Sequence, residues 1–253
     1  MPTASGDLWV RRFHPKPRAT RRLVCFPHAG GGASFWYPLS NTMDPDVDVL
    51  VVQYPGREDR LLEEPLDDLS AVADGAFEAL RPGLDGRTAF LGHSMGAIVA
   101  FEVARRAEAA EAAAGPGLLI ASACEAPSLV RREWRVAEQD DPALLAALSR
   151  LGGTTLTADT DQELLSTVMP AIRADLGAVE RYRSTRSAVL SAPVVALLGE
   201  QDPHVDRDQV RDWAHHTTTR FALRSLPGDH FYPTADIDRF AAVVAGCLAE
   251  SAR

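Results

Sequence analysis

Short apolar runs alternate along this chain with longer segments in which apolar residues recur every three or four positions. The runs are almost continuously apolar, as expected for strands of a parallel sheet that is buried on both faces. They cover residues 23–26, 47–52, 88–91, 118–123, 194–198 and 221–226, with a further edge strand predicted around 8–13. This alternation predicts an α/β fold with a mostly parallel central sheet flanked by helices.

Helices are predicted between the runs. The helical period is followed closely in 69–80, and the last two helices are predicted for 206–216 and 236–252. Within 206–216, His215 and His216 are sequential neighbours that point in different directions from a helix. We therefore interpret the pair as surface residues.

One segment, 125–192, separates two predicted strands without any strand signal of its own. A helix is predicted to begin at Asp141 and to end before Gly152, and a second helix begins near Asp161. Pro170 is expected to restart or kink the second helix.

These signals predict a core formed by 1–124 and 193–253, with 125–192 inserted as a helical lid. The apolar residues of the insertion have two interpretations. Most must pack helices against the core, and some could line a substrate pocket. The sequence does not separate the two groups.

Composition limits the classes of function. A chain of 253 residues with 46% apolar residues suits one α/β domain with an insertion, and a net charge of −9 argues against nucleic acid or an anionic membrane as the main partner. The three cysteines lie far apart and predict buried thiols, not disulfides or a metal site. The N-terminus lacks an apolar signal segment and no stretch is long enough to span a membrane, so a cytoplasmic protein is expected.

The strongest motif is G-x-S-x-G at 92–96, with Ser94 at its centre. A predicted strand precedes it and a predicted helix follows it, which is the context of a nucleophile elbow. The turn forces Ser94 into a strained backbone conformation, so Gly92 and Gly96 must be small. The positive end of the following helix then lies beneath the serine.

Two further polar residues follow predicted strands that end at the same edge of the sheet. Asp202 is the predicted acid, with Glu200 as its competitor, and His230 stands where a general base is expected. The chain order nucleophile, acid, histidine is that of the α/β-hydrolase fold. In that chemistry the histidine accepts the serine proton during attack on an acyl carbon, and the carboxylate orients the imidazole.

A small-residue loop, His-Ala-Gly-Gly-Gly at 28–32, follows the first strong strand. It resembles the loop that supplies the second backbone N–H of an oxyanion hole. Glycines such as Gly30 allow close approach of the backbone, and we predict the N–H groups of Met95 and Ala29 as the donors. A phosphate-binding loop is disfavoured because no Lys-Ser/Thr follows. His28 comes from the wrong strand to be catalytic and is expected to shape the loop.

Arginines gather in and beside the insertion. They are Arg131, Arg132, Arg135, Arg181, Arg183 and Arg186. A solvated helix face is the simpler interpretation. The functional alternative is a docking surface for an acidic partner or a phosphate group.

Taken together, these motifs resemble the stand-alone type II thioesterases that accompany polyketide synthases and non-ribosomal peptide synthetases. The segments that carry the resemblance are 25–34, 53–58, 92–97, 202–203 and 228–231, and they span nearly the whole chain. The Pro-Gly-Arg-Glu sequence within 53–58 is not required of a general esterase. The chain departs from the family at Asp229, where a small residue is frequent, and so places a negative charge beside the base.

The resemblance implies hydrolysis of acyl groups held as thioesters on the phosphopantetheine arm of acyl or peptidyl carrier proteins. The role would be to remove stalled or misloaded units, with Ser94 as nucleophile, His230 as base and Asp202 as its orienting acid. It implies no cofactor and no metal, because the phosphopantetheine belongs to the carrier protein. We expect the enzyme to act as a monomer.

Three other functions stay open. The first is a general small-molecule carboxylesterase with the same triad, and the second is a chain-releasing thioesterase or cyclase. The third is a carrier-binding module without chemistry, against which the intact triad argues. The Pro-Gly-Arg-Glu sequence and the arginines of the insertion favour carrier-bound substrates, and the short free-standing chain counts against a cyclase.

Overall fold

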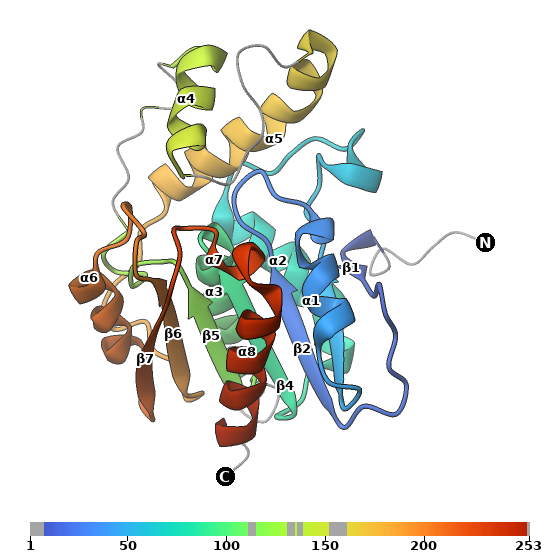
Figure 1. Cartoon of the computed structure of the whole chain (residues 1–253), viewed down its shortest axis with the longest axis vertical. Helices are drawn as coiled ribbons and strands as arrows, with labels where there is room; N and C mark the ends of the chain where they lie inside the picture. The colour runs from blue at the N-terminus through green and yellow to red at the C-terminus, as the bar shows by residue number, and fades with distance from the viewer. Residues whose placement is uncertain (1–7, 111–114, 131–134, 136–138, 152–160, 252–253) are drawn as a thin grey trace.

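The computed structural model describes residues 8–110, 115–130, 135, 139–151 and 161–251. A seven-stranded sheet runs through the centre of this part of the chain (Figure 1). Its strands are β1 (Val10–Arg11), β2 (Arg21–Phe26), β3 (Val47–Val52), β4 (Thr88–His93), β5 (Leu118–Ser122), β6 (Val194–Gly199) and β7 (Phe221–Leu226). Their spatial order is β1-β3-β2-β4-β5-β6-β7, with β1 antiparallel to β3 and the other pairings parallel.

The predicted strands are therefore confirmed, and the structure is of the predicted α/β-hydrolase class. The edge strand is shorter than expected, since only Val10 and Arg11 pair with β3. Strands β4, β5 and β6 are buried along their whole length, whereas most of β7 is half-buried because it lies at the other edge of the sheet.

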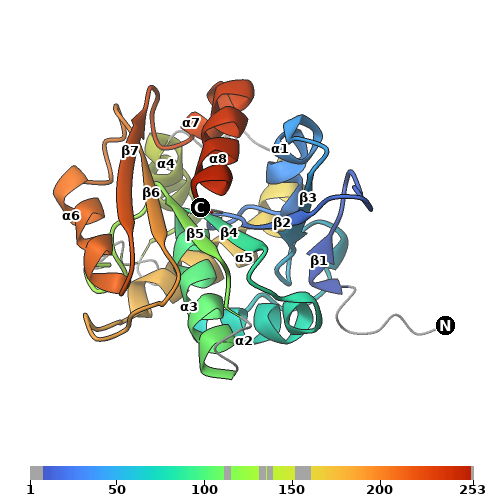
Figure 2. The same ribbon diagram turned by 90° about the horizontal axis from the view of Figure 1, so that it is seen from below.

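Helices cover both faces of the sheet (Figure 2). They are α1 (Tyr37–Thr42), α2 (Leu69–Leu80), α3 (Met95–Ala110), α6 (Arg207–Arg211), α7 (Tyr232–Ala235) and α8 (Ile237–Ser251). Side chains of α2 and α3 share one buried cluster with Val24 and Phe26, while those of α1 and α8 share a second with Leu23 and Cys25. The alternation along β2 follows from the two-residue repeat of a strand, which sends successive side chains to opposite faces.

Short 3₁₀ helices complete the connections between these elements. They are η2 (Ala33–Trp36), η3 (Glu58–Arg60), η4 (Arg81–Gly83) and η5 (Asp212–His216). The predicted helix 206–216 is thus α6 followed by η5, and 236–252 corresponds to α8.

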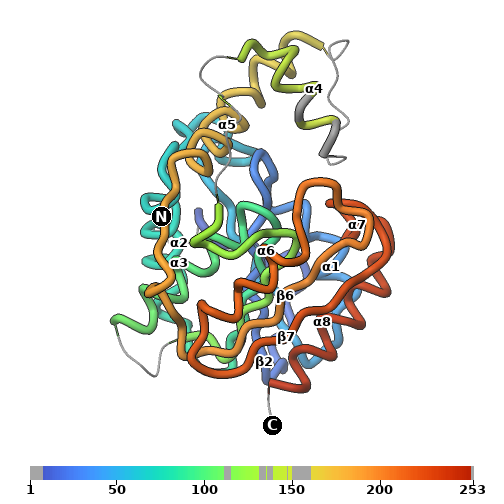
Figure 3. The backbone as a smooth tube through the Cα atoms, turned by 90° about the vertical axis from the view of Figure 1, so that its left-hand side faces the viewer, coloured from blue at the N-terminus to red at the C-terminus, as the bar shows by residue number. Residues whose placement is uncertain are grey.

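The segment between β5 and β6 contributes α4 (Asp141–Leu151) and α5 (Gln162–Arg181), which lie beyond the carboxyl ends of the strands (Figures 1 and 3). The second helix starts where predicted, because the Asp161 carboxylate accepts the N–H groups of Glu163 and Leu164. Pro170 lies inside one continuous helix and does not restart it. Gly152, the predicted end of the first helix, lies outside the described residues.

The interpretation of His216 as a surface residue is wrong. Its side chain is fully buried, with Nδ1 2.7 Å from the carbonyl oxygen of Ala188 and Nε2 2.9 Å from the hydroxyl of Ser128. Burial lowers the pKa of this imidazole. His215 does lie at the surface, 3.3 Å from a carboxylate oxygen of Asp212. The sequence predicted an α-helix at this point, but His215 and His216 lie in the 3₁₀ helix η5. Its tighter turn directs the His216 side chain into the protein and the His215 side chain to the surface.

Candidate active site

Ser94 occupies a strained turn between β4 and α3. Its φ is +55°, in the left-handed region that a residue with a side chain rarely adopts. A Cβ added to Gly92 would lie 2.1 Å from the carbonyl oxygen of Gly96, and one added to Gly96 would lie 2.2 Å from that of Phe26. Both glycines are thus required by close backbone contacts. Ser94 itself is only half-buried, so its hydroxyl can be reached.

Asp202 and His230 are brought together from the ends of β6 and β7. The distance from His230 Nδ1 to Asp202 Oδ2 is 2.7 Å, and both side chains are almost completely buried. Burial acts to raise the pKa of Asp202, but hydrogen bonds from His230 and from the backbone N–H of His204 outweigh it, so the pKa lies below its ordinary value. Since an ionised carboxylate only accepts, His230 donates from Nδ1 and leaves Nε2 free to accept a proton.

Glu200, the competitor for the acid, is exposed and lies at the start of the same loop. Asp229, the unusual neighbour of the base, is also exposed, and its carboxylate accepts the N–H of Phe231 at 2.8 Å. Neither side chain replaces Asp202 as the partner of His230. The elbow and the base are neighbours, because the ring centroids of His93 and His230 are 5.3 Å apart. Among the described residues no hydrogen bond joins the Ser94 hydroxyl to His230, as is common before a substrate binds.

The two predicted oxyanion donors lie on segments that touch. Met95 is the first residue of α3, where the backbone N–H has no partner within the helix. Gly96 packs against the carbonyl groups of Phe26 and Pro27, which lead directly into the loop that contains Ala29. In the described part of the chain neither the Met95 N–H nor the Ala29 N–H donates to a protein acceptor, so both remain available to a ligand.

Gly30 has a different role from its neighbour. Its φ is +75°, which favours glycine, and its N–H donates to Asp175 Oδ2 at 2.7 Å. Asp175 belongs to α5, so a residue of the insertion touches the predicted oxyanion loop.

The segment 53–58 holds the same loop from the sheet side. Gln53 Oε1 accepts the N–H of Ala33 at 2.6 Å, and the Glu58 carboxylate accepts both the N–H and the hydroxyl of Ser34. The Tyr54 hydroxyl donates to the carbonyl oxygen of Pro27 at 3.3 Å. From the sequence this motif was taken to favour carrier-bound substrates, and its contacts with the loop were not predicted. The available signal was that it directly follows β3, the strand beside β2.

Two further histidines lie beside the site and are neutral. His28 lies against the rings of Phe35 and Phe231, and burial of its ring, with His230 and Arg57 nearby, lowers its pKa to about 3. Its carbonyl oxygen accepts the N–H of Gly31, which is consistent with the predicted part in shaping the loop. Burial also lowers the pKa of His93.

A polar chain that the sequence did not reveal anchors the elbow. His93 Nδ1 lies 3.0 Å from the Ser122 hydroxyl, which is 2.6 Å from the Tyr232 hydroxyl. Tyr232 begins α7, two residues after His230, so the chain joins the elbow to the base loop.

Six buried side chains of α4 and α5 form a separate apolar cluster. They are Leu144, Leu145, Leu165, Met169, Ile172 and Leu176. Ala29 packs against this cluster, which therefore lies next to the predicted oxyanion loop.

The arginines at the end of α5 make contacts within the protein. Arg181 pairs with Asp67 and Arg186 with Asp212, while Arg183 donates to nearby backbone carbonyls. Arg131 and Arg132 lie outside the described residues. The docking surface that these side chains suggested stays a prediction.

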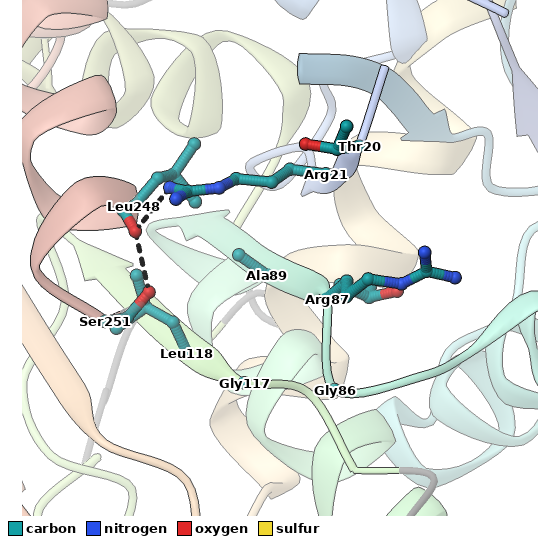
Figure 4. Close-up of a pocket in the computed structure, with 10 residues that line it drawn as sticks. Thr20, Arg21, Gly86, Arg87, Ala89, Gly117, Leu118, Leu248 and Ser251 are labelled. Atoms are coloured by element: carbon teal, nitrogen blue, oxygen red, sulfur yellow. Dashed lines mark hydrogen bonds between the residues drawn. The ribbon is translucent and has the colours of Figure 1, made fainter. Parts of the chain in front are cut away.

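The described residues contain no cluster of His, Cys, Asp or Glu that could hold a metal ion, and no helix among them could span a membrane. Cys25, Cys124 and Cys247 are buried and form no disulfide. A cavity of about 290 Å³ opens at the amino ends of the strands, where Arg21 and Ser251 both donate to the carbonyl of Leu248 (Figure 4). It lies at the opposite end of the sheet from Ser94.

Comparison with known proteins shows the family to which this chain belongs. The sequence profile described as "Thioesterase domain" matches residues 21–250. The chain is 45% identical to Thioesterase PikA5 of Streptomyces venezuelae over 228 residues, which are 90% of this chain and 80% of that protein.

Solved structures agree. The type II thioesterase BorB from the borrelidin biosynthetic cluster superimposes with a TM-score of 0.86 at 41% identity, covering 98% of this chain and 100% of that one. YbtT, a type II thioesterase from the yersiniabactin pathway, gives a TM-score of 0.85 at 28% identity over 96% of this chain and 99% of that one.

Proposed function

The chain belongs to the thioesterase family, and from that premise we propose that it is a type II thioesterase that edits carrier-bound acyl groups. Its substrates are acyl thioesters on the phosphopantetheine arm of acyl or peptidyl carrier proteins in polyketide or non-ribosomal peptide biosynthesis. The observation that carries the chemistry is the bonded Asp202–His230 pair beside a strained, accessible Ser94. The likeness to PikA5, BorB and YbtT supports the substrate class.

The reaction proceeds through an acyl-enzyme. Ser94 attacks the thioester carbon while His230 Nε2 takes its proton, and the same nitrogen returns the proton to the departing thiolate. Asp202 keeps the imidazole in the required tautomer and stabilises its positive charge. A water molecule activated by His230 then releases the acyl group from Ser94.

The N–H groups of Met95 and Ala29 stabilise the oxyanion that forms in each half of the reaction. Removing one such donor from an enzyme costs roughly a hundredfold to a thousandfold in turnover. Triad and donors suffice for a labile thioester, so the enzyme needs no cofactor or metal of its own. The phosphopantetheine enters with the carrier protein.

Residues 125–192 act as a lid over a core formed by 1–124 and 193–253. The position of α4 and α5 beyond the strand ends, with their apolar cluster against Ala29, supports this division. The partly buried Leu148 and Val168, which border that cluster, are the residues that we assign to acyl contact. The enzyme acts as a monomer in the cytoplasm, beside the synthase that it serves.

The experiment compares three substrate sets, each carrying the same panel of acyl groups: carrier-bound thioesters, free pantetheine thioesters and oxygen esters. Wild type is measured beside Ser94→Ala. Faster cleavage of the carrier-bound set, abolished in Ser94→Ala, is the expected result. Equal or faster cleavage of oxygen esters, without benefit from the carrier, contradicts the proposal and favours a general esterase.

The remaining alternatives predict other products. A chain-releasing cyclase would yield cyclic products from a long acyl chain with an internal nucleophile, where an editing enzyme yields the free acid. A binding module without chemistry would not be labelled at Ser94 by a fluorophosphonate.

A further inference from the structure

Asp175 is a buried carboxylate with a place in no step of the reaction. It lies on α5, and its side chain is only 2% exposed. On the same helix, Leu165, Met169, Ile172 and Leu176 turn toward the apolar cluster, so an acid is unexpected on this buried face. Burying a charge is costly unless it is paired and hydrogen-bonded.

The contacts of Asp175 join three segments that are distant in sequence. Its Oδ2 accepts the N–H of Gly30 at 2.7 Å and a guanidinium N–H of Arg57 at 2.7 Å. The Arg57 side chain is itself only 7% exposed. One oxygen of the lid helix therefore connects the predicted oxyanion loop to the Pro-Gly-Arg-Glu sequence.

Gly30 is tightly confined at this point. A Cβ on Gly30 would lie 2.8 Å from Cγ1 of Ile172, one turn before Asp175 on α5. The peptide that carries the Gly30 N–H also contains the carbonyl of Ala29. The orientation of this peptide group constrains the backbone rotation at Ala29, and the N–H of Ala29 is the proposed oxyanion donor.

The sheet side of the loop is fixed differently. Gln53 and Glu58 hold the N–H groups of Ala33 and Ser34, at the far end of the loop from Ala29. The side chain of Arg57 is linked to the near end through Asp175, whose Oδ2 also accepts the N–H of Gly30. The helix α5 thus completes a support that the segment 53–58 provides in part.

We propose that Asp175 is a positioning residue for the oxyanion hole, and that the hole is fully formed only when α5 is seated on the loop. The inference rests on the proposed function only in taking the Ala29 N–H as an oxyanion donor. It gives the Pro-Gly-Arg-Glu sequence a role in catalysis through Arg57, instead of a role in recognising the carrier protein. It also links the lid to the chemistry by a direct contact.

The test uses two substitutions of the intact chain. Asp175→Asn keeps an acceptor oxygen and removes the charge, and Asp175→Ala removes both. Active enzyme is counted by complete labelling with a fluorophosphonate, so that loss of folded protein does not enter the rate. Arg173→Gln is the matched control. Arg173 lies two residues before Asp175 on α5, and the substitution breaks its solvent-accessible ion pair with Asp141 of α4.

Turnover is measured on a pantetheine thioester and on a p-nitrophenyl ester. We expect kcat per active site to fall about fivefold for Asp175→Asn and about tenfold to a hundredfold for Asp175→Ala. These losses are smaller than the loss expected when an oxyanion donor is removed outright, because the donor is displaced and not deleted. KM stays within about twofold, because the ground-state carbonyl depends less on the hole than the transition state does. Arg173→Gln retains wild-type turnover.

The affinity of a trifluoromethyl ketone provides a second readout. This inhibitor forms a tetrahedral adduct on Ser94 and places an oxyanion in the hole. Its affinity should weaken by the same factor as kcat, a correlation that a merely structural role does not produce. Unchanged kcat and inhibitor affinity in the labelled Asp175 variants, or an equal loss in Arg173→Gln, would overturn the proposal.

This outcome is independent of the natural substrate. If carrier-bound thioesters prove no better than oxygen esters, the editing function fails. The Asp175 effect would still be present on both small substrates. If carrier-bound thioesters are preferred but Asp175→Ala turns over normally, the positioning role fails alone.

Discussion

The edge of the sheet and the helices above it are built in different ways. Ser94, Asp202 and His230 each follow a strand whose neighbours are hydrogen-bonded along its length, and two large apolar clusters back those strands on both faces. Helices α4 and α5 share a separate cluster of six buried side chains, and Ala178 and Val179 near the end of α5 belong to one of the two large clusters. Individual polar contacts also join α5 and its end to the rest, among them Arg57–Asp175 and the 2.9 Å hydrogen bond from Tyr182 to Glu102.

This difference separates the residues at the sheet edge, which are held rigidly, from the lid helices, which can move to admit a substrate. Strand register places the triad without help from the insertion, and close backbone contacts at Gly92 and Gly96 leave the elbow no freedom. Helix α4 and the first turns of α5 can shift at lower cost, because the smaller cluster of six side chains holds them. The Asp175 contact matters because it makes one part of the fixed chemistry depend on the adjustable part.

The largest effect is expected from removing the nucleophile at the sheet edge. Ser94→Ala should lower thioester hydrolysis by at least a thousandfold, and Asp202→Asn by a comparable factor, because the triad acts as a unit. Steady-state hydrolysis and fluorophosphonate labelling measure the two changes. Both variants should retain the unfolding temperature of wild type to within a few degrees. Substantial hydrolysis by Ser94→Ala would show that another residue is the nucleophile.

The next effect tests the rigidity of the elbow. Gly96→Ala places a Cβ 2.2 Å from the carbonyl oxygen of Phe26 and 2.5 Å from that of Pro27, and neither backbone atom can turn away. We expect a loss of about 3 kcal/mol in the free energy of unfolding, measured in urea, together with slow labelling of Ser94. Gly86→Ala is the control, since a Cβ there meets nothing within 4 Å. Equal stability of the two variants would contradict the close contact.

A smaller effect should appear in the pH dependence of the link between lid and site. Burial raises the pKa of Asp175 to about 6, although Arg57 and the Gly30 N–H act against the shift. Above pH 6 the carboxylate is ionised and holds Arg57. Below pH 6 it is protonated and resembles the amide of Asp175→Asn. The ratio of wild-type to Asp175→Asn kcat should therefore fall from about fivefold toward one as the pH drops through 6.

The ratio isolates Asp175 because the other groups that face it keep their charge. Tyr54, over which Arg57 lies, has its pKa raised by burial and stays neutral, as does His28 with a pKa near 3. Parallel pH profiles for kcat, with a constant ratio from pH 5 to 8, would contradict the assignment.

The smallest effect is expected from the exposed face of the lid. Arg173 and Asp141 join α5 to α4 with side chains that are 31% and 49% exposed. Surface ion pairs contribute about 0 to 1 kcal/mol, so Arg173→Gln should change the free energy of unfolding by no more than that. Its kcat should stay within about twofold of wild type. A larger loss would mean that the contact between α4 and α5, and not Asp175 alone, links the lid to turnover.

Much of the site was predictable because its signals are local. Continuous apolar runs marked the strands, and the residues that follow each run at the carboxyl edge gave Ser94, Asp202 and His230. The glycines on either side of Ser94 predict a turn that only small flanking residues allow. A strand that is buried on both faces is apolar along its length, so its position can be predicted from the sequence. The residues that follow it can then be placed at the edge of the sheet.

Tertiary structure alone decided the contacts between distant side chains. Asp175 lies 118 residues from Arg57 and 145 from Gly30, and in the sequence it is one of three acidic residues on its helix. The sequence also placed His216 at the surface, whereas packing against Phe101 and Trp213 buries it at the end of η5. A charge or an imidazole is read from sequence as solvated, because solvation is its lowest-energy state in isolation. Only the packing of α5 on the predicted oxyanion loop and on Arg57 supplies the partners that make a buried Asp175 possible.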